Sequence, residues 1–325
     1  MKKIMYFSLI LPIYNVEAYL RECLSLILNQ SFTDFECLMI DDGSTDGSAN
    51  ICKSFENQDV RFKYHYKDNG GLSDARNYGL CKSSGEYIVF IDSDDVVSSE
   101  LLSIVRKCID QHEADIVYFD YLKFYSELPA LNATAISENC SLISNAELAQ
   151  KPNFAWARIA RKTLYGNNLF PVGLIYEDVF TSPILSAKAK RIVYIKNALY
   201  GYRKRPNSIT TGSAERQFGL FETVHQLKKY IIENQIGYEY YSTALVNLIQ
   251  SCLVSLVRIN EPKKRRLYTN LIVEEYKDLT ICDIWGSYSL NKFKLLTLLS
   301  KNRFTLILLS VILRPVVLFS DRKGK

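Results

Sequence analysis

The stretch Glu86–Asp95, EYIVFIDSDD, joins a run of apolar and aromatic residues directly to three carboxylates. The run EYIVFI has the composition of a buried β-strand, and the carboxylates that end it repel one another. Either Asp95 caps the helix expected from about Ser98, or the cluster holds a cation. The two interpretations are compatible, because in an extended segment Asp92 and Asp94 project to one side and Asp95 to the other.

Similar runs precede and follow this stretch and alternate with segments of helical spacing. The expected strands are residues 6–11, 35–40, 60–65, 86–91 and 115–121, and the expected helices are 16–30, 44–56, 73–82 and 98–112. Continuous apolar strands separated by helices predict an α/β fold with a mostly parallel, Rossmann-like sheet covered by helices. Ligands bind such sheets at the carboxyl ends of the strands, here in the polar loops PIYNVE, DDGSTDGS, KDNGGLSDARNYG and DSDD.

The overall charge is small: 40 Lys and Arg against 35 Asp and Glu give a formal net charge of +5 in 325 residues. This gives no indication of nucleic-acid binding. Eight cysteines are scattered without a C-x-x-C pair, so we expect buried thiols in a reducing compartment. The opening MKKIMYFSLIL ends at PIYNVE without a small-residue cleavage site, which indicates a first core strand and a cytoplasmic protein.

The D-x-D pattern of Asp92 and Asp94 supplies two hard oxygen ligands, which suit Mg²⁺ or Mn²⁺ and leave positions for phosphate oxygens. In NGGLSDARNYG, Arg76 can pair with a diphosphate through its planar fork, or with a buried aspartate. In DDGSTDGS, the carboxylates of Asp41 and Asp42 belong either to a turn and helix cap or to recognition of a pyrimidine or ribose. Neither a G-x-G-x-x-G nor a P-loop motif is present.

Taken in order, PIYN, DDGSTDGS, NGGLSDARNYG, IDSDD and YEDVF resemble the motifs of glycosyltransferase family 2, which contains inverting, nucleotide-sugar-dependent enzymes of GT-A fold. The resemblance covers about residues 5–105 and resumes over about 150–210, but it does not specify the last 110 residues. It implies a nucleotide-sugar donor, most often a UDP-sugar, a divalent metal ion (Mn²⁺ or Mg²⁺) and a saccharide acceptor.

The resemblance also assigns the donor nucleotide to the first loops. Pro12, Tyr14 and Glu17 would shape the nucleotide pocket. The other donor-binding residues that it implies are Asp41 and Asp42 for the base, Asp74 and Arg76 for the donor, and Asp92 for the ribose. Asp94 would bind the metal ion together with Asp92, and Asp95 would assist.

In YEDVF, Asp178 resembles the general base of the family, and Glu177 is its neighbour. A carboxylate is suited to take the proton of an attacking hydroxyl, whereas the simpler interpretation is charge at a helix N-terminus. Arg203 and Arg205 in RKRPNSIT either close over the diphosphate or form a solvated surface. Trp156 either stacks on the acceptor sugar or belongs to the core.

Residues from about 215 onwards are expected to be helical, and the chain ends in a basic segment. The run FTLILLSVIL (304–313) would span about 15 Å as a helix, half of a hydrocarbon core of about 30 Å. Arg314 and Pro315 are expected to interrupt it. We therefore expect a helix that lies on an anionic membrane surface rather than one that crosses it; the alternative is a terminal helix packed on the domain or a dimer contact. The flanking cations are Lys301, Arg303, Arg314, Arg322 and Lys323.

Three parts are expected: a nucleotide-sugar-binding part (1–120), an acceptor and catalytic-base part of the same domain (121–212), and a helical region (213–325). The resemblance implies transfer of one sugar to a lipid-linked O-antigen or capsule unit at the inner face of the membrane. The Q-x-x-R-W motif of processive members is absent. The alternatives are a sugar-1-phosphate nucleotidyltransferase and an inactive nucleotide-sugar-binding scaffold.

Overall fold

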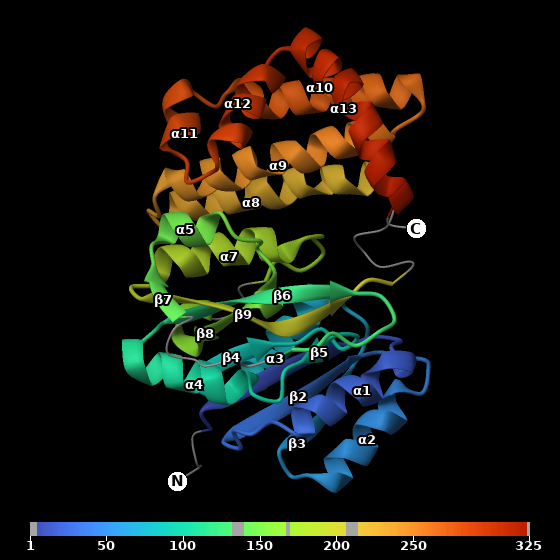
Figure 1. Cartoon of the computed structure of the whole chain (residues 1–325), viewed down its shortest axis with the longest axis vertical. Helices are drawn as coiled ribbons and strands as arrows, with labels where there is room; N and C mark the ends of the chain where they lie inside the picture. The colour runs from blue at the N-terminus through green and yellow to red at the C-terminus, as the bar shows by residue number, and fades with distance from the viewer. Residues whose placement is uncertain (1–4, 132–139, 167–169, 206–213, 324–325) are drawn as a thin grey trace. The chain divides into compact units, whose positions relative to one another are not determined.

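The computed structural model describes residues 5–131, 140–166, 170–205 and 214–323 (Figure 1). The chain forms two compact units. The first comprises residues 1–148, 152–173 and 188–206, and the second comprises 149–151, 174–187 and 207–325. The sequence placed a boundary at 212 and kept residues 174–187 with the acceptor part, whereas in the structure these residues group with the C-terminal helices.

The first half of the sheet is parallel. Its strands lie in the order β3 (Phe62–Lys67), β2 (Phe35–Asp42), β1 (Phe7–Ile13) and β4 (Tyr87–Phe90). β1, β2 and β4 are fully buried, which explains their mainly apolar sequences, whereas the edge strand β3 is only partly buried. Ile13 pairs with Asp41 and Asp42 with Lys67, so the polar residues that end the strands share one edge.

The second half of the sheet is mixed. β8 (Arg158–Arg161) is antiparallel to both β4 and β6 (Ile116–Phe124), and β6 is parallel to β9 (Ile192–Arg203). β5 (Val96–Val97) and β7 (Cys140–Ile143) are antiparallel to β9. The predicted α/β class is therefore confirmed, but the parallel arrangement that the sequence extended to most of the sheet is limited to β3–β2–β1–β4 and the β6–β9 pair.

The four longer helices of the first unit lie close to the predicted segments; they are α1 (Glu17–Leu28), α2 (Ser48–Gln58), α3 (Leu72–Lys82) and α4 (Leu101–His112). The sequence did not predict the short helices α5 (Asn145–Ala149) and α6 (Lys162–Tyr165) or the 3₁₀ turn at Ala155–Ala157. α3 lies directly against β1, because a Cβ at Gly79 would collide with the side chain of Ile10. The side-chain amide of Asn77 in the same helix donates to Phe170 O (2.7 Å) and accepts from Phe170 N (3.1 Å). These contacts fix α3 relative to the sheet.

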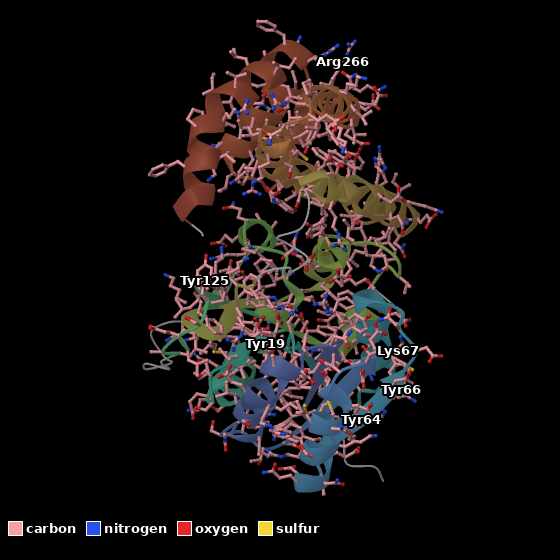
Figure 2. All side chains as sticks on the ribbon, turned by 90° about the vertical axis from the view of Figure 1, so that its right-hand side faces the viewer. Tyr19, Tyr64, Tyr66, Lys67, Tyr125 and Arg266 are labelled. Carbon is pink, nitrogen blue, oxygen red and sulfur yellow. The ribbon has the colours of Figure 1, made fainter. Side chains whose placement is uncertain are left out.

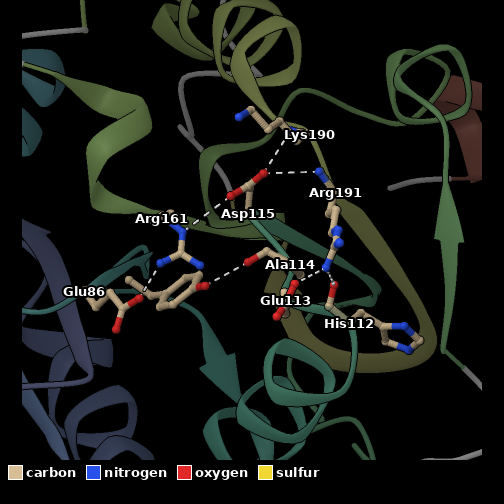
Figure 3. Close-up of polar contacts among 9 residues, drawn as sticks. Glu86, His112, Glu113, Ala114, Asp115, Arg161, Lys190 and Arg191 are labelled. Carbon is tan, nitrogen blue, oxygen red and sulfur yellow. Dashed lines mark hydrogen bonds and ion pairs between the residues drawn. The ribbon is translucent and has the colours of Figure 1, made fainter.

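An ionic cluster holds together the ends of the sheet where β4, β6 and β9 begin (Figure 3). We call it the Asp115 cluster; its members are Glu86, Glu113, Asp115, Arg161 and Arg191. Asp115 accepts hydrogen bonds from the backbone N–H of Lys190 (2.8 Å) and Arg191 (3.1 Å), and from Arg161 Nε (3.4 Å). Arg161 also pairs with Glu86, and Arg191 pairs with Glu113. The guanidinium of Arg161 thus lies between two carboxylates, and that of Arg191 pairs with a third.

The second unit is helical, as predicted for the end of the chain; its later helices run from yellow to red in Figure 1. α9 is the helix on which the others pack, and among the described residues it is the one helix long and apolar enough to cross a membrane. However, 78% of its apolar window is buried, as expected for a core helix. The helices from α7 onwards are α7 (Glu177–Lys188), α8 (Leu220–Glu233), α9 (Tyr238–Arg258), α10 (Pro262–Lys277), α11 (Ile281–Gly286), α12 (Asn291–Ser300) and α13 (Arg303–Lys323), with a 3₁₀ helix at Ala214–Gly219.

The last helix corrects one expectation. Arg314 and Pro315 do not interrupt the apolar run, because α13 continues through both residues to Lys323. One side of α13 packs on α9, with Leu306, Ser310 and Val317 buried. The simple alternative considered from the sequence, a terminal helix packed on its own domain, therefore describes this side of α13.

Candidate active site

The loop that follows β4 carries the three aspartates, and each of them faces a different partner. Asp92 Oδ1 pairs with Arg76 Nη2 at 3.0 Å. Asp94 Oδ2 forms an ion pair with Arg205 Nε at 2.5 Å. The Asp92 and Asp94 side chains are 29% and 17% exposed, so both carboxylates keep an open approach from solvent.

Asp95 is held in the protein interior. Its Oδ1 accepts the backbone N–H of Arg203 (2.7 Å), and its Oδ2 accepts the hydroxyl of Tyr200 (2.8 Å). Asp95 therefore neither caps α4, which begins at Leu101, nor presents a free oxygen to a metal ion. Its expected assistance in metal binding does not fit the structure.

Burial and neighbouring charge raise the pKa of two of the three aspartates, Asp94 and Asp95. Burial raises the pKa of Asp94, and the negative charge of Asp92 raises it further, while Arg205 acts in the opposite direction. The pKa of Asp95 lies well above its usual range because of burial and then because of the charges of Asp92 and Asp94. An added cation beside Asp94 would favour the ionised form of that carboxylate.

The metal expectation can be tested against these positions. Within the described parts of the chain, no group of three His, Cys, Asp or Glu side chains lies together as a ready metal site. Mg²⁺ is commonly held by only one or two carboxylates, with phosphate oxygens and waters as the remaining ligands. Asp92 and Asp94, which are adjacent, accessible and mutually repelling, fit that smaller ligand set.

Tyr200 supports this loop and was not singled out from the sequence. Its hydroxyl donates to Asp95 and accepts the backbone N–H of Asp92 (3.1 Å). Its ring stacks on Trp156 at 4.3 Å between centroids, and Trp156 stacks on Phe154 at 4.7 Å. No sequence motif marks Tyr200, because only the pairing of β5 with β9 brings it under the loop.

The same aromatic stack corrects the acceptor role suggested for Trp156. Trp156 is buried, and its two ring faces are covered by Phe154 and Tyr200. It offers no open face to a sugar, so the core interpretation is the one that the structure supports.

The loop after β1 is tied to the loop after β2. Glu17 Oε2 accepts the backbone N–H of Gly47 (2.5 Å), and Glu17 N donates to Asp46 Oδ2 (3.0 Å). Asn15, in a left-handed conformation with φ 50°, accepts the N–H of Thr45 at Oδ1 (2.8 Å). Glu17 therefore connects the two loops, and its role in a nucleotide pocket stays a prediction.

Two other residues of the predicted pocket differ in exposure. Tyr14 is exposed. Pro12 is buried, and its carbonyl oxygen accepts the hydroxyl of Ser93 (2.8 Å), which connects the first loop to the aspartate loop. Of these two residues, only Tyr14 presents an open side chain to a ligand.

Asp41 and Asp42 are both buried and hydrogen-bonded within the protein. Asp41 accepts Ser44 N (2.8 Å) and the hydroxyl of Tyr64 (2.7 Å). Asp42 accepts the backbone N–H of Gly70 (2.9 Å) and Gly71 (2.8 Å) and the ammonium of Lys67 (2.5 Å). Figure 2 labels Tyr64 and Lys67, which both belong to β3. Recognition of a base by these carboxylates stays a prediction, because their described contacts hold turns.

Lys67 connects Asp42 to the third loop. Its ammonium also pairs with Asp74 at 2.6 Å, in the first turn of α3. Two residues further along the helix, Arg76 is buried, with its guanidinium carbon 5.6 Å from the ring centre of Phe90 and 5.4 Å from that of Phe170. The structure thus shows Arg76 as the buried partner of Asp92, and donor contact by Asp74 and Arg76 stays a prediction.

The two arginines at the end of β9 differ from each other, and Arg203 fits neither expectation. Arg203 is buried: it donates from Nε to Asp94 O (2.8 Å), pairs with Glu22 and lies over Phe124. It is a support of the aspartate loop, neither a mobile arm nor a solvated residue. Arg205 is partly exposed and remains available to a diphosphate. The rest of RKRPNSIT, from residue 206, lies outside the described residues.

Glu177 and Asp178 lie in the first turn of α7, which belongs to the second unit. Glu177 is buried, and Asp178 is partly exposed. The preceding residue, Tyr176, has a φ of 57°, a left-handed conformation that is unfavourable for a bulky side chain and is found more often at functional sites. The catalytic assignment of this pair stays a prediction.

Comparison with known proteins identifies the family. Residues 8–153 match the family model described as Glycosyl transferase family 2. Glycosyltransferase GlyG of Streptococcus pneumoniae is 32% identical over 219 residues, which cover 62% of this chain and 72% of GlyG. The chain belongs to glycosyltransferase family 2. The resemblance inferred from its loop motifs is confirmed.

Two further comparisons concern the coverage of a relative and the fold of the whole chain. Glycosyltransferase GlyA of the same organism is 33% identical over 62% of this chain, but that alignment spans only 31% of GlyA. The crystal structure of S. aureus TarS 1–349 in complex with UDP-GlcNAc is similar with a TM-score of 0.74 at 21% identity, covering 99% of this chain and 93% of TarS 1–349. The GT-A fold with a helical C-terminal region is therefore confirmed.

Proposed function

We propose that the chain transfers one sugar from a nucleotide-sugar, a UDP-sugar, to a saccharide acceptor with inversion at the transferred carbon. The observation that carries this proposal is the pair of accessible, mutually repelling carboxylates, Asp92 and Asp94, at the carboxyl edge of the sheet of a family 2 chain. We propose an acceptor carried on a polyprenyl diphosphate, such as an O-antigen or capsule unit, at the cytoplasmic face of the membrane.

UDP-GlcNAc is the first donor to consider, because TarS was crystallised with it. In this chain, the exposed ring of Tyr14 offers a flat apolar surface on which a base can stack. The partly exposed guanidinium of Arg205 can exchange Asp94 for the diphosphate, for which its planar fork is suited.

Asp92 and Asp94 are the residues that would hold a Mn²⁺ or Mg²⁺ ion. When bound, such an ion stabilises the negative charge that develops on the leaving diphosphate. The buried Arg76 keeps Asp92 oriented, and Tyr200 with Arg203 holds the loop through Asp95. These residues position the two carboxylates before the donor arrives.

The acceptor hydroxyl must lose its proton as it attacks the sugar carbon. We assign this proton to the Asp178 carboxylate, with Glu177 as its neighbour in the first turn of α7. The oxygen of the acceptor forms the new glycosidic bond while the bond from the sugar to UDP breaks on the opposite side. A single displacement of this kind inverts the configuration.

A donor panel tests the proposal. Purified full-length chain is incubated with UDP-GlcNAc, UDP-glucose or UDP-galactose, with Mn²⁺ or with a chelator, and the products are separated. We expect release of UDP from one donor, dependent on metal, and a donor-dependent rise in melting temperature. Release of pyrophosphate would instead indicate a nucleotidyltransferase, and donor binding without any turnover would indicate a scaffold.

A further inference from the structure

α13 exposes a continuous apolar face. We call it the outer face of α13; it consists of Phe304, Ile307, Leu308, Val311, Ile312 and Phe319, whose exposed fractions lie between 43% and 75%. The spacing of three and four residues places these side chains on one side of the helix. The opposite side holds the buried Leu306, Ser310 and Val317, so α13 is apolar on two sides but covered on only one.

This arrangement differs from that of α9. α9 is also apolar, but most of its apolar window is buried, so its composition is accounted for by the core of the second unit. The core does not account for the outer face of α13. Contiguous exposed apolar surface of this extent usually marks a site where a protein or a membrane binds.

The charges around this face are of one sign. Arg303 and Arg314 are exposed, and they lie eleven residues apart, close to three helical turns, so they project on the same flank of α13. No acidic residue occurs between Lys301 and Ser320. The surface therefore combines apolar side chains with a basic flank and has no acidic counterpart.

We propose that the outer face of α13 docks on an anionic lipid surface. Its apolar side chains would enter the boundary between headgroups and acyl chains, and Arg303 and Arg314 would lie among the lipid phosphates. Dimerisation through this face is less favourable than lipid binding. It would bring the basic flanks of two copies together, and α13 has no acidic residue between Lys301 and Ser320 to offset their repulsion. Full insertion is disfavoured because the other side packs on α9 and because Arg314 lies in the middle of the helix.

The proposal goes beyond glycosyl transfer and does not depend on it. All of its residues lie in the second unit, whereas Asp92 and Asp94 lie in the first. Vesicle binding can therefore be measured without a donor or an acceptor, and failure of one proposal leaves the other intact.

The experiment is co-sedimentation of the full chain with phosphatidylcholine vesicles, with and without phosphatidylglycerol. We expect binding to the anionic vesicles, lost on raising the salt concentration, and at least about a tenfold loss for Val311→Lys. Ile232→Lys is the matched control, because Ile232 is equally exposed (62% against 61% for Val311) but lies on α8. Arg303→Gln and Arg314→Gln should each weaken binding about fivefold.

Phe304→Ser is a second variant that adds no charge, and its melting temperature and that of Val311→Lys show whether the fold is intact. Three results would overturn the proposal. The first is a failure of the wild-type chain to bind anionic vesicles, or binding that Val311→Lys and Phe304→Ser leave unchanged. The second is a lipid-free dimer that Val311→Lys dissociates, which would make the face a contact between copies. The third is vesicle association that resists alkaline carbonate, which would indicate a spanning helix.

Discussion

Two charged clusters lie at opposite ends of the same sheet, and they are built differently. In the Asp115 cluster, where β4, β6 and β9 begin, Arg161 pairs with both Glu86 and Asp115, and Arg191 pairs with Glu113 (Figure 3). In the loop after β4, three aspartates follow one another within four residues, and the charge of Asp92 raises the pKa of both Asp94 and Asp95. Both clusters contain arginine–carboxylate pairs, but in the loop after β4 the pairs with Arg76 and Arg205 do not cancel the repulsion, since burial and neighbouring carboxylates still raise the pKa of Asp94 and Asp95. Adjacent like charges, rather than charge density, distinguish the candidate site.

Among the substitutions considered, Asp94→Ala is expected to have the largest effect on activity. Loss of a metal-binding carboxylate should reduce UDP release by a factor on the order of 10² to 10³. The melting temperature should hold or rise, because the substitution removes a repelled charge. The control is Asp110→Ala, since Asp110 is an exposed aspartate that also pairs with an arginine. Equal loss of activity in both variants would contradict the metal role.

Asp178→Asn extends the comparison to the second unit. Removing a general base while keeping the shape of the side chain should reduce transfer to the acceptor about 10²-fold. Donor binding, measured by thermal stabilisation with UDP and Mn²⁺, should be unchanged, because Asp178 is assigned to the acceptor proton. Loss of donor binding in Asp178→Asn would contradict the assignment of Asp178 as the general base.

Tyr200→Phe tests whether Asp95 acts through the loop. The substitution removes the hydroxyl that connects Asp95 to the backbone of Asp92, so the apparent affinity for Mn²⁺ should fall about tenfold, with activity recovered at high Mn²⁺. The matched control is Tyr194→Phe, because the Tyr194 hydroxyl also donates to an aspartate, Asp120 (2.6 Å). A lowered activity that excess Mn²⁺ does not restore would speak against a positioning role.

Asp115→Ala should have the smallest effect on turnover. It leaves the backbone N–H groups of Lys190 and Arg191 without an acceptor and removes one of the two carboxylates that pair with Arg161, so we expect a loss of about 1–3 kcal/mol in the free energy of unfolding by urea. UDP release per folded molecule should stay near the wild-type value. A loss of UDP release comparable to that of Asp94→Ala would mean that the two ends of the sheet are not functionally distinct.

The sequence predicted what depends on local pattern. The strand runs placed β1 to β4 and the loops at their carboxyl ends, and the order of motifs identified the family. It did not predict the mixed half of the sheet, because β8 and β9 pair with strands distant in the sequence. For the same reason it missed Tyr200 and misjudged Asp95 and Arg203, which meet only through the pairing of β5 with β9.

Other corrections have a different cause. Trp156 and Arg203 are residue types that bind ligands on many surfaces, and only their burial shows that they serve the interior here. Pro315 was expected to end a helix because it lacks an N–H, but the helix packing against α9 continues past it. In each case packing between distant elements decided the outcome, and no local pattern reports such packing.

The hydrogen bonds from Asn15 and Glu17 to the neighbouring loop have a consequence for specificity. Because Thr45 and Gly47 already donate hydrogen bonds to these side chains, the two loops are held together before a donor binds. A donor that binds between them would therefore lose little affinity to the entropy cost of ordering the loops. A change in nucleobase specificity would then require new hydrogen bonds between the two loops. Substitutions confined to exposed residues such as Tyr14 would change the affinity for the donor more than the choice of nucleobase.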